Sequence, residues 1–269
     1  PAVQKPVPTP DAATPAPETR PKPIEYEVFT DVDPVIPENV RPKHVDKTPR
    51  IAIIIDDIGY DSRMALALFE LDPNITFSVL PFSPKGASLS SILHEKGAQV
   101  MLHLPMEPVQ YPRVNPGPGA ILSAMSPDEL IAQLRKDLKA VPHAVGVNNH
   151  MGSRLTASSS QMNQIFTILK KENLFFIDSR TAPRSQGRAS ARLLKIRFAQ
   201  RDVFLDNFQN SDYITGQLKE LIGLARKHGS AIGIGHPYRA TLETLAREIP
   251  KLKKEVRIVR ASDLTHIQG

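Results

Sequence analysis

The sequence predicts an α/β fold in which strands and helices alternate from about residue 50 onward, and three observations support this. Short apolar runs, each of a length typical of one buried strand, recur along this part of the chain. Stretches with helical apolar periodicity separate them, so the βα unit repeats six or more times. Carboxylates, imidazoles and amides directly follow several runs. A closed barrel and an open sheet both fit this alternation, and both place ligands at the carboxyl ends of the strands.

The individual elements follow from the apolar patterning. Short runs rich in Ile, Val, Leu and Phe predict strands at 51–55, 75–80, 99–102, 144–147, 175–177, 203–205, 231–234 and 256–259. Apolar residues at helical spacing predict helices at 62–71, 86–96, 127–140, 160–172, 212–228 and 240–248. Two helices have clear start signals, because Ser126 precedes Pro127 with Glu129 in the first turn, and serines 158–160 precede the fourth helix.

The first 49 residues form a separate region with a different composition. Twelve of the 25 prolines lie within the first 50 residues. Residues 1–23 combine Pro with Ala, Val, Lys and Thr, a composition that favours extended polyproline segments and lacks the apolar residues that a core needs. Residues 24–50 contain more apolar residues, so part of this stretch is expected to lie along the domain surface. We therefore predict a Pro-rich tether at 1–49 and one domain at 50–269.

The tether and the absence of cysteine together indicate the compartment. A Pro-, Ala- and Lys-rich stretch before a folded domain is typical of sequence downstream of a removed signal or an omitted membrane anchor. Zero Cys suits an exported bacterial protein and is also compatible with the cytosol. We expect a periplasmic or cell-envelope protein that contacts the membrane only through such an N-terminal anchor.

The charge of the domain is positive. Residues 51–269 contain 27 Lys and Arg against 20 Asp and Glu, while the whole chain carries a formal charge of +6. A moderately basic surface suits an anionic partner such as a cell-wall polymer, membrane headgroups or nucleic acid. The chain has no Trp, only 6% aromatic residues and no zinc-finger spacing, so we expect no nucleic-acid partner.

The most informative motif is the sequence IAIIIDDIG at residues 51–59. Its apolar run predicts a buried strand, and Asp56 and Asp57 follow at the carboxyl end, where ligand sites form. The alternative is that one of these acids only caps the next helix. A cap needs one side chain, however, and Ile58 and Gly59 indicate a loop. Two carboxylates are therefore predicted at the mouth of a site.

Three histidines also follow buried strands. His103 ends the third predicted strand, His150 ends the fourth within the sequence NNHMGS, and His236 follows a late strand. A single histidine in such a place is more often a hydrogen-bonded structural residue than a ligand. The joint placement of all three at strand ends favours one shared site.

Further polar residues share these strand ends. Glu107 lies four positions after His103 in a turn between two prolines, and Asp178 and Arg180 follow the fifth strand. The alternatives are that Glu107 is a solvated loop acid, that Asp178 only turns the chain, and that Arg180 only pairs with Asp178.

One Asp and two His with an open position form the donor set expected for a catalytic divalent metal, above all zinc. A metal held in this way lowers the pKa of bound water and polarises a carbonyl oxygen, which makes hydrolysis of an amide or ester feasible at neutral pH. A second carboxylate then serves as the base, and a histidine across the site protonates the leaving group.

The Asp-Asp pair, the sequence HLPMEP at 103–108 and Ile234-Gly235-His236 resemble the NodB-like polysaccharide deacetylases, in particular their divergent polysaccharide deacetylase branch, over residues 50–264. The resemblance implies that Asp56 is the catalytic base, Asp57 a metal ligand and His103 the first metal histidine. Glu107 stands where the family's second metal histidine would be. Either Glu107 or His150 then completes the metal site, and we favour His150 because the metal keeps two nitrogen donors.

The same resemblance assigns the remaining roles. It implies that His236 is the general acid, that Asp178 orients it and that Arg180 assists. The family's usual Arg and aromatic motif is not recognisable at 148–154. The resemblance further implies an irregular (β/α) barrel of about seven strands.

These observations predict a metal-dependent hydrolase, with zinc as the expected cofactor, that deacetylates a cell-envelope polysaccharide or peptidoglycan-type glycan at C–N or ester bonds. One alternative is a glycan-binding or scaffold protein that has the same fold and little or no turnover. A second alternative is another metal hydrolase such as a phosphoesterase, which would usually need more carboxylates around two metals.

Overall fold

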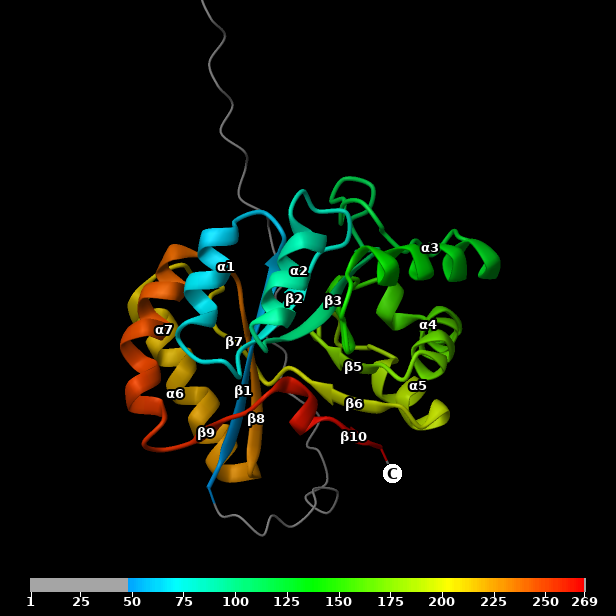
Figure 1. Cartoon of the computed structure of the whole chain (residues 1–269). Helices are drawn as coiled ribbons and strands as arrows, with labels where there is room; N and C mark the ends of the chain where they lie inside the picture. The colour runs from blue at the N-terminus through cyan, green and yellow to red at the C-terminus, as the bar shows by residue number, and fades with distance from the viewer. Residues whose placement is uncertain (1–47, 269) are drawn as a thin grey trace, which may run out of the picture.

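A single curved sheet of ten strands forms the centre of the computed structural model, which describes residues 48–268 (Figure 1). The spatial order is β10-β6-β5-β4-β3-β2-β1-β8-β7, with β9 also paired to β1. All pairings are parallel except that of β10 with β6. The strands are β1 (Arg50–Ile58), β2 (Thr76–Val79), β3 (Gln99–Met106), β4 (Gly146–Met151), β5 (Phe175–Asp178), β6 (Arg197–Gln200), β7 (Val203–Phe204), β8 (Ser230–Gly235), β9 (Arg257–Ile258) and β10 (His266–Ile267).

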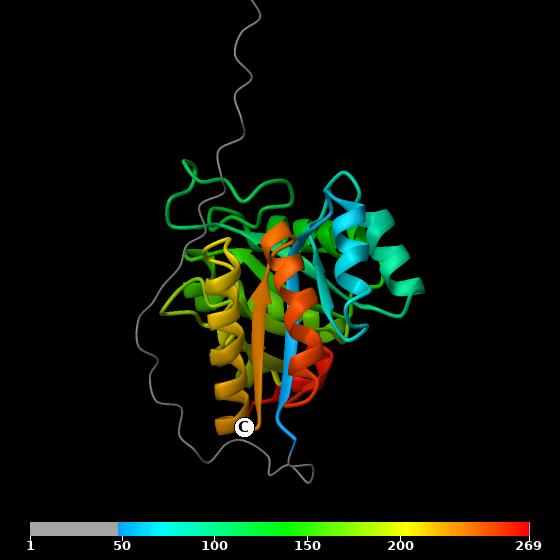
Figure 2. The same cartoon turned by 90° about the vertical axis from the view of Figure 1, so that its left-hand side faces the viewer.

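Helices cover the convex face of this sheet, and α6 and α7 pack over β8 and β1 (Figure 2). The capping box predicted for the third helix is present, since Ser126 and Glu129 bond reciprocally. The helices are α1 (Ser62–Phe69), α2 (Gly86–Glu95), α3 (Pro127–Ala140), α4 (Ser159–Lys171), α5 (Gly187–Leu194), α6 (Ser211–His228) and α7 (Arg239–Leu252), with 3₁₀ turns at Leu155–Ala157 and Ala261–Leu264. In residues 48–268, the helices are too short or too polar to cross a membrane.

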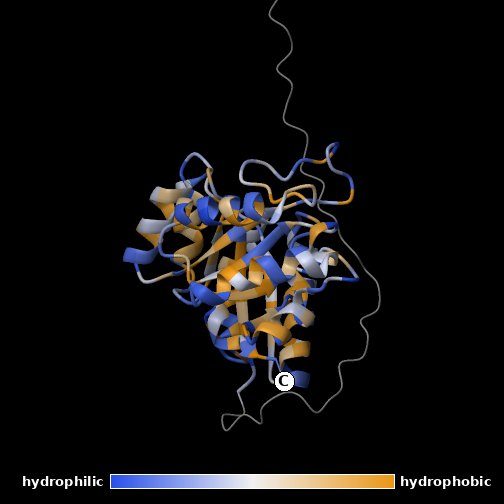
Figure 3. Ribbon diagram, turned by 90° about the vertical axis from the view of Figure 1, so that its right-hand side faces the viewer, coloured by the Kyte–Doolittle hydropathy of each residue, from blue (hydrophilic) through white to orange (hydrophobic). Residues whose placement is uncertain are grey.

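The two faces of each strand build two separate parts of the core. In β1, Ile51, Ile53 and Ile55 pack outward against the helices, while Ala52 and Ile54 belong to a smaller cluster on the inner, concave face. This follows from the period of two along a strand. Figure 3 shows the apolar residues concentrated along the central strands. The alternation matters for function because it decides which strand-end side chains point into the sheet's concave side.

The sheet is a half-barrel rather than the closed barrel of about seven strands that we expected. Strands β6 and β7 are consecutive in the chain yet pair at opposite ends of the sheet. Between them, Arg201 donates its backbone N–H to the carbonyl of Asp178, and Asp202 donates to that of Ile232. The chain thus crosses from one end of the sheet to the other, and in the described part no strand ladder joins β6 to β7. The α/β class is confirmed.

The sequence patterning located most elements but missed three. Strand β6, helix α5 and the two-residue strand β10 lie in a stretch with few apolar runs and in the C-terminal tail. Strands β1, β3 and β4 extend further than predicted, because their ends carry polar residues that still pair with the neighbouring strands. The predicted tether at 1–49 lies outside the described residues except for Thr48 and Pro49.

Candidate metal centre

The inward faces of neighbouring strands bring five of the polar strand-end residues to one point on the concave side. Each continues the inward alternation of its own strand, as Asp56 follows Ala52 and Ile54 in β1. All five are buried. These residues are Asp56, His103, Asn148, His150 and His236.

Asp57 reaches the same point through a local irregularity in β1. Simple alternation would direct its side chain outward, toward the helices. The pairing of β1 with β2 shifts register between Ile55 and Ile58, and Asp57 itself has a left-handed backbone with φ of 55°. Such bulges re-aim a side chain and are common beside functional sites. Capping does not explain the acid pair, because Asp61 is the residue that caps α1.

Asp57, His103 and His150 form a compact triangle of ligand-type atoms. Asp57 Oδ1 lies 3.2 Å from His103 Nε2 and 3.1 Å from His150 Nδ1, and the two imidazole nitrogens are 3.1 Å apart. Ligand atoms at about 2.0 to 2.2 Å from one zinc ion lie about 3.0 to 3.5 Å from each other. The three donors therefore fit one divalent metal ion.

Asn148 fixes the protonation of His103. Its side-chain nitrogen donates to Asp56 Oδ1 at 2.8 Å, so its oxygen faces His103 Nδ1 at 2.9 Å and also accepts from Ser78. A flipped amide would set two oxygens against each other at Asp56. His103 Nδ1 must therefore carry the proton, which leaves the lone pair of Nε2 directed toward Asp57 and His150, as a metal ligand requires.

The charges in this cluster shift several pKa values. Burial alone would raise the pKa of Asp57, but the neighbouring His150 and His103 hold it well below the usual range. Burial would lower the pKa of His103, and Asp56 and Asp57 raise it instead. Burial raises the pKa of Asp56 against the opposing charges of His103 and His236. The ligand-type acid Asp57 is thus ionised, whereas Asp56 binds a proton more readily than an ordinary aspartate.

His236 is held by Asp206, and the prediction that Asp178 orients it is corrected. Asp206 accepts hydrogen bonds from His236 Nδ1 at 2.8 Å and from the His236 backbone N–H at 2.6 Å. Burial lowers the pKa of His236, but the charge and hydrogen bond of Asp206 outweigh this and raise it to about 9. We did not identify Asp206 from the sequence. The available signal was its position two residues after the inward-facing Phe204.

Asp178 lies on the outer side of the sheet, where α5 begins. It has the same strand parity as Phe176, which packs outward. Its carboxylate accepts from Ser185 Oγ at 2.5 Å and from the backbone N–H of Arg180 at 2.8 Å. Arg180 belongs to the same turn, with φ of 54°. The structure therefore places both residues in an outward turn and not beside His236.

Glu107 does not join the metal cluster, which corrects it as a candidate ligand. One carboxylate oxygen accepts from the backbone N–H and the hydroxyl of Ser123, the latter at 2.7 Å, and the other lies 3.3 Å from Arg154 Nη1. Glu107 thus fastens the long loop between β3 and α3 to the end of β4. In residues 48–268, the ligand-type cluster consists of Asp57, His103 and His150.

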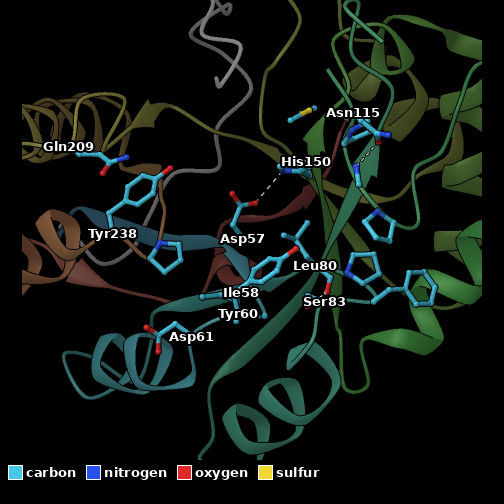
Figure 4. Close-up of a pocket in the computed structure, with 18 residues that line it drawn as sticks. Asp57, Ile58, Tyr60, Asp61, Leu80, Ser83, Asn115, His150, Gln209 and Tyr238 are labelled. Carbon is cyan, nitrogen blue, oxygen red and sulfur yellow. Dashed lines mark hydrogen bonds and ion pairs between the residues drawn. The ribbon is translucent and has the colours of Figure 1, made fainter. Parts of the chain in front are cut away.

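A pocket of about 610 Å³ opens beside this cluster, and Asp57 and His150 are among the residues that line it (Figure 4). Loops after β1, β2, β3, β7 and β8 supply the other walls. A bound molecule can therefore contact the cluster from the side of the strand carboxyl ends, as expected for a parallel α/β sheet.

Comparison with known proteins identifies the family. The sequence model described as divergent polysaccharide deacetylase matches residues 53–265. This chain belongs to the divergent polysaccharide deacetylase family. The resemblance inferred from the strand-end motifs is thereby confirmed. A curated relative, the uncharacterized protein YibQ of Escherichia coli strain K12, is 35% identical over 215 residues, which are 80% of this chain and 67% of YibQ.

Solved structures support the half-barrel architecture of this member of the divergent polysaccharide deacetylase family. An uncharacterized protein of Agrobacterium tumefaciens C58 superposes with a TM-score of 0.77 at 24% identity, covering 84% of this chain and 92% of that one. A CE4 family pseudoenzyme from Bacillus anthracis superposes with a TM-score of 0.53 at 13% identity, covering 81% and 65%. At these identities the likeness establishes the fold alone.

Proposed function

We propose that this protein is a metal-dependent hydrolase that removes acetyl groups from an acetylated cell-envelope polysaccharide or peptidoglycan-type glycan. Family membership supports the reaction class. The observation that carries the proposal is the joint placement of a metal-ligand triangle, the buried carboxylate of Asp56 beside it, and the His236–Asp206 pair. Ester and amide hydrolysis needs these three parts, which are an electrophile-activating site, a base and an acid.

Asp57, His103 and His150 are the residues that would hold the metal. Two imidazole nitrogens and one carboxylate oxygen favour zinc over the harder ions magnesium and calcium. A zinc ion bound there would polarise the acetyl carbonyl and lower the pKa of a water molecule in the site.

Asp56 is the proposed general base. Its Oδ1 accepts the hydrogen bond from Asn148, whereas Oδ2 faces the metal cluster at 3.7 Å from His103 Nε2. Oδ2 is therefore the atom that takes the proton of the attacking water. Burial raises the pKa of this carboxyl, which makes it a better proton acceptor than an exposed aspartate.

His236 is the proposed general acid. Asp206 engages Nδ1, so Nε2 is the nitrogen that gives its proton to the departing amine or sugar oxygen. A pKa of about 9 keeps the imidazole protonated at neutral pH, which is the form that an acid requires. The ring of Phe204 lies nearly parallel to this imidazole, with the two ring centroids 5.9 Å apart.

The periplasm or cell envelope is the proposed location. The Pro-rich tether and the absence of Cys support it. A cell-envelope glycan would be accessible to an exported protein in that compartment.

Acetate release tests the proposed function. Zinc-loaded wild-type protein is incubated with acetylated chitooligosaccharides and with peptidoglycan fragments, and Asp56→Asn is compared with it. We expect acetate release from the wild type and a loss of about 100-fold or more in kcat for Asp56→Asn with the metal content unchanged. Glycan binding without acetate release by the wild type would instead favour a binding or scaffold protein. The fold likeness to a CE4 family pseudoenzyme supports this alternative.

A further inference from the structure

The pocket beside the metal cluster has two exposed aromatic side chains in its wall. Tyr60, from the loop after β1, is 59% exposed, and Phe82, from the loop after β2, is 50% exposed. Figure 4 shows Tyr60 and Tyr238 together with Asp57 among the residues that line this pocket. Ligand pockets are lined mostly by hydrophobic and aromatic side chains, so exposed aromatic rings in a pocket wall are candidates for ligand contact.

The backbone of Phe82 is held in an unfavourable conformation. Its φ is 56°, in the left-handed region that costs a residue with a bulky side chain free energy relative to glycine or asparagine. Gly119 supports the ring on one side, since a Cβ there would lie 3.1 Å from Phe82 Cε2. Strain combined with exposure favours a functional reason for the ring, because glycine or asparagine would satisfy this backbone better.

The charge of the pocket differs from that of the domain. Of the 18 residues that line the pocket, Asp57 and Asp61 are acidic, and none is Lys or Arg. Residues 51–269 as a whole carry an excess of seven positive charges. Phosphate, sulfate and carboxylate groups are recognised by Arg, Lys or backbone N–H donors. In the metal-free protein, an anionic ligand would therefore meet these two acids and no Lys or Arg among the lining residues.

We infer that Tyr60 and Phe82 form a stacking platform that binds an uncharged N-acetylated oligosaccharide across the pocket, and that in the metal-free protein the two acids of the pocket disfavour anionic glycans. The apolar C–H face of a sugar ring packs on an aromatic ring, as other apolar groups do. The platform lies in the same pocket as Asp57, so a stacked chain reaches the metal cluster with a neighbouring sugar. The inference rests on the proposed function for the identity of the ligand as an acetylated glycan.

Binding without turnover tests this platform separately from catalysis. The probe is the N-acetylglucosamine tetramer, titrated by calorimetry into the full chain freed of metal with EDTA. Phe82→Asn retains a residue that tolerates the left-handed backbone, and Phe82→Leu keeps an apolar side chain without a ring. We expect Kd to rise about tenfold or more in both variants, and likewise in Tyr60→Ala. The matched control is Leu193→Ala, an exposed apolar residue of α5 outside the pocket, which leaves Kd unchanged.

A second probe tests the charge selection. The hyaluronan tetrasaccharide alternates N-acetylglucosamine with glucuronate, so it matches the first probe in length and adds carboxylates. We expect it to bind about tenfold more weakly than the neutral tetramer. The platform is contradicted if the wild type does not bind the tetramer or if both Phe82 variants bind it like the wild type. Equal affinity for the neutral tetramer and the hyaluronan tetrasaccharide contradicts the charge selection. Acetate release plays no part in these readouts, so a failure of the proposed function remains distinguishable.

Discussion

Asp206 holds His236 by two hydrogen bonds, one to ring Nδ1 at 2.8 Å and one to the backbone N–H at 2.6 Å. Thr241 Oγ1 donates to the same carboxylate at 2.7 Å. Both partners of the pair are buried, so this ion pair is screened little by solvent. The carboxylate fixes both the orientation of the imidazole and its protonation.

Replacing Asp206 should lower the pKa of His236. Asp206→Asn removes the charge that raises the pKa of His236 most, whereas the charges of Asp57 and Asp56 still oppose the effect of burial. We expect the pKa to fall from about 9 toward the ordinary value of 6.5. NMR titration of the ring proton of His236 measures this shift.

Asp178→Asn is the matched control for that titration. Asp178 is a buried acid at the end of β5, but it faces Ser185 on the outer side of the sheet. Its substitution should leave the pKa of His236 unchanged. A fall in this variant similar to that in Asp206→Asn would restore Asp178 as the orienting residue.

The same pair makes stability depend on pH. The pKa of His236 in the folded protein is raised above the unfolded value of 6.5. Protonated His236 therefore stabilises the fold fully below pH 6.5, and this stabilisation is lost as pH rises through about 9. A shift of this size corresponds to about 3 kcal/mol. Urea unfolding in EDTA at pH 6 and pH 9.5 should show that wild type loses its advantage over Asp206→Asn at the higher pH. An advantage that stays constant between the two pH values would refute this linkage.

Strand-end reasoning predicted the site because alternation and parallel pairing are local rules. Asp56, His103, His150 and His236 all lie at the carboxyl ends of strands whose apolar cores are visible in the sequence. Asn148 lies at such an end too, but the sequence did not single it out. Asp57 joined them for a reason the sequence does not display, namely the register shift and left-handed backbone in β1.

The errors have equally specific causes. Asp178 was assigned to the site by its strand-end position, although its parity with Phe176 directs it outward. Asp206 was missed although it directly follows the strand predicted at 203–205, because the family resemblance assigned the orienting role to Asp178. The sequence could not show whether the sheet closes into a barrel. This depends on how Arg201 and Asp202 carry the chain from β6 to β7 across the sheet.

Asn148 should control metal affinity although it is not a ligand. Asn148→Ala removes the acceptor that keeps His103 Nδ1 protonated and the donor to Asp56. We expect zinc affinity to fall about 10- to 100-fold, the usual cost of losing a partner behind a metal-binding histidine. Competition with a chromophoric chelator measures it. Asn149→Ala, at a buried neighbouring position that bonds Thr181 and Ser179 instead, should leave the affinity within twofold or so of wild type.

Glu107 should matter for stability. Glu107→Gln disrupts a buried carboxylate that accepts from Ser123 and pairs with Arg154, so we expect the free energy of unfolding to fall by about 1 to 3 kcal/mol. Urea unfolding measures the loss. Glu243→Gln breaks the exposed pair with Arg239 and should change stability by less than about 1 kcal/mol. Equal effects of the two substitutions would show that Glu107 does not fasten the loop.

Zinc titration by calorimetry tests the central claim, that Asp57, His103 and His150 hold one metal ion. We predict one zinc per wild-type chain, an affinity weaker by about tenfold or more in His150→Ala, and wild-type stoichiometry and affinity in Glu107→Gln. Undiminished zinc binding by His150→Ala, together with loss of binding in Glu107→Gln, would contradict the account.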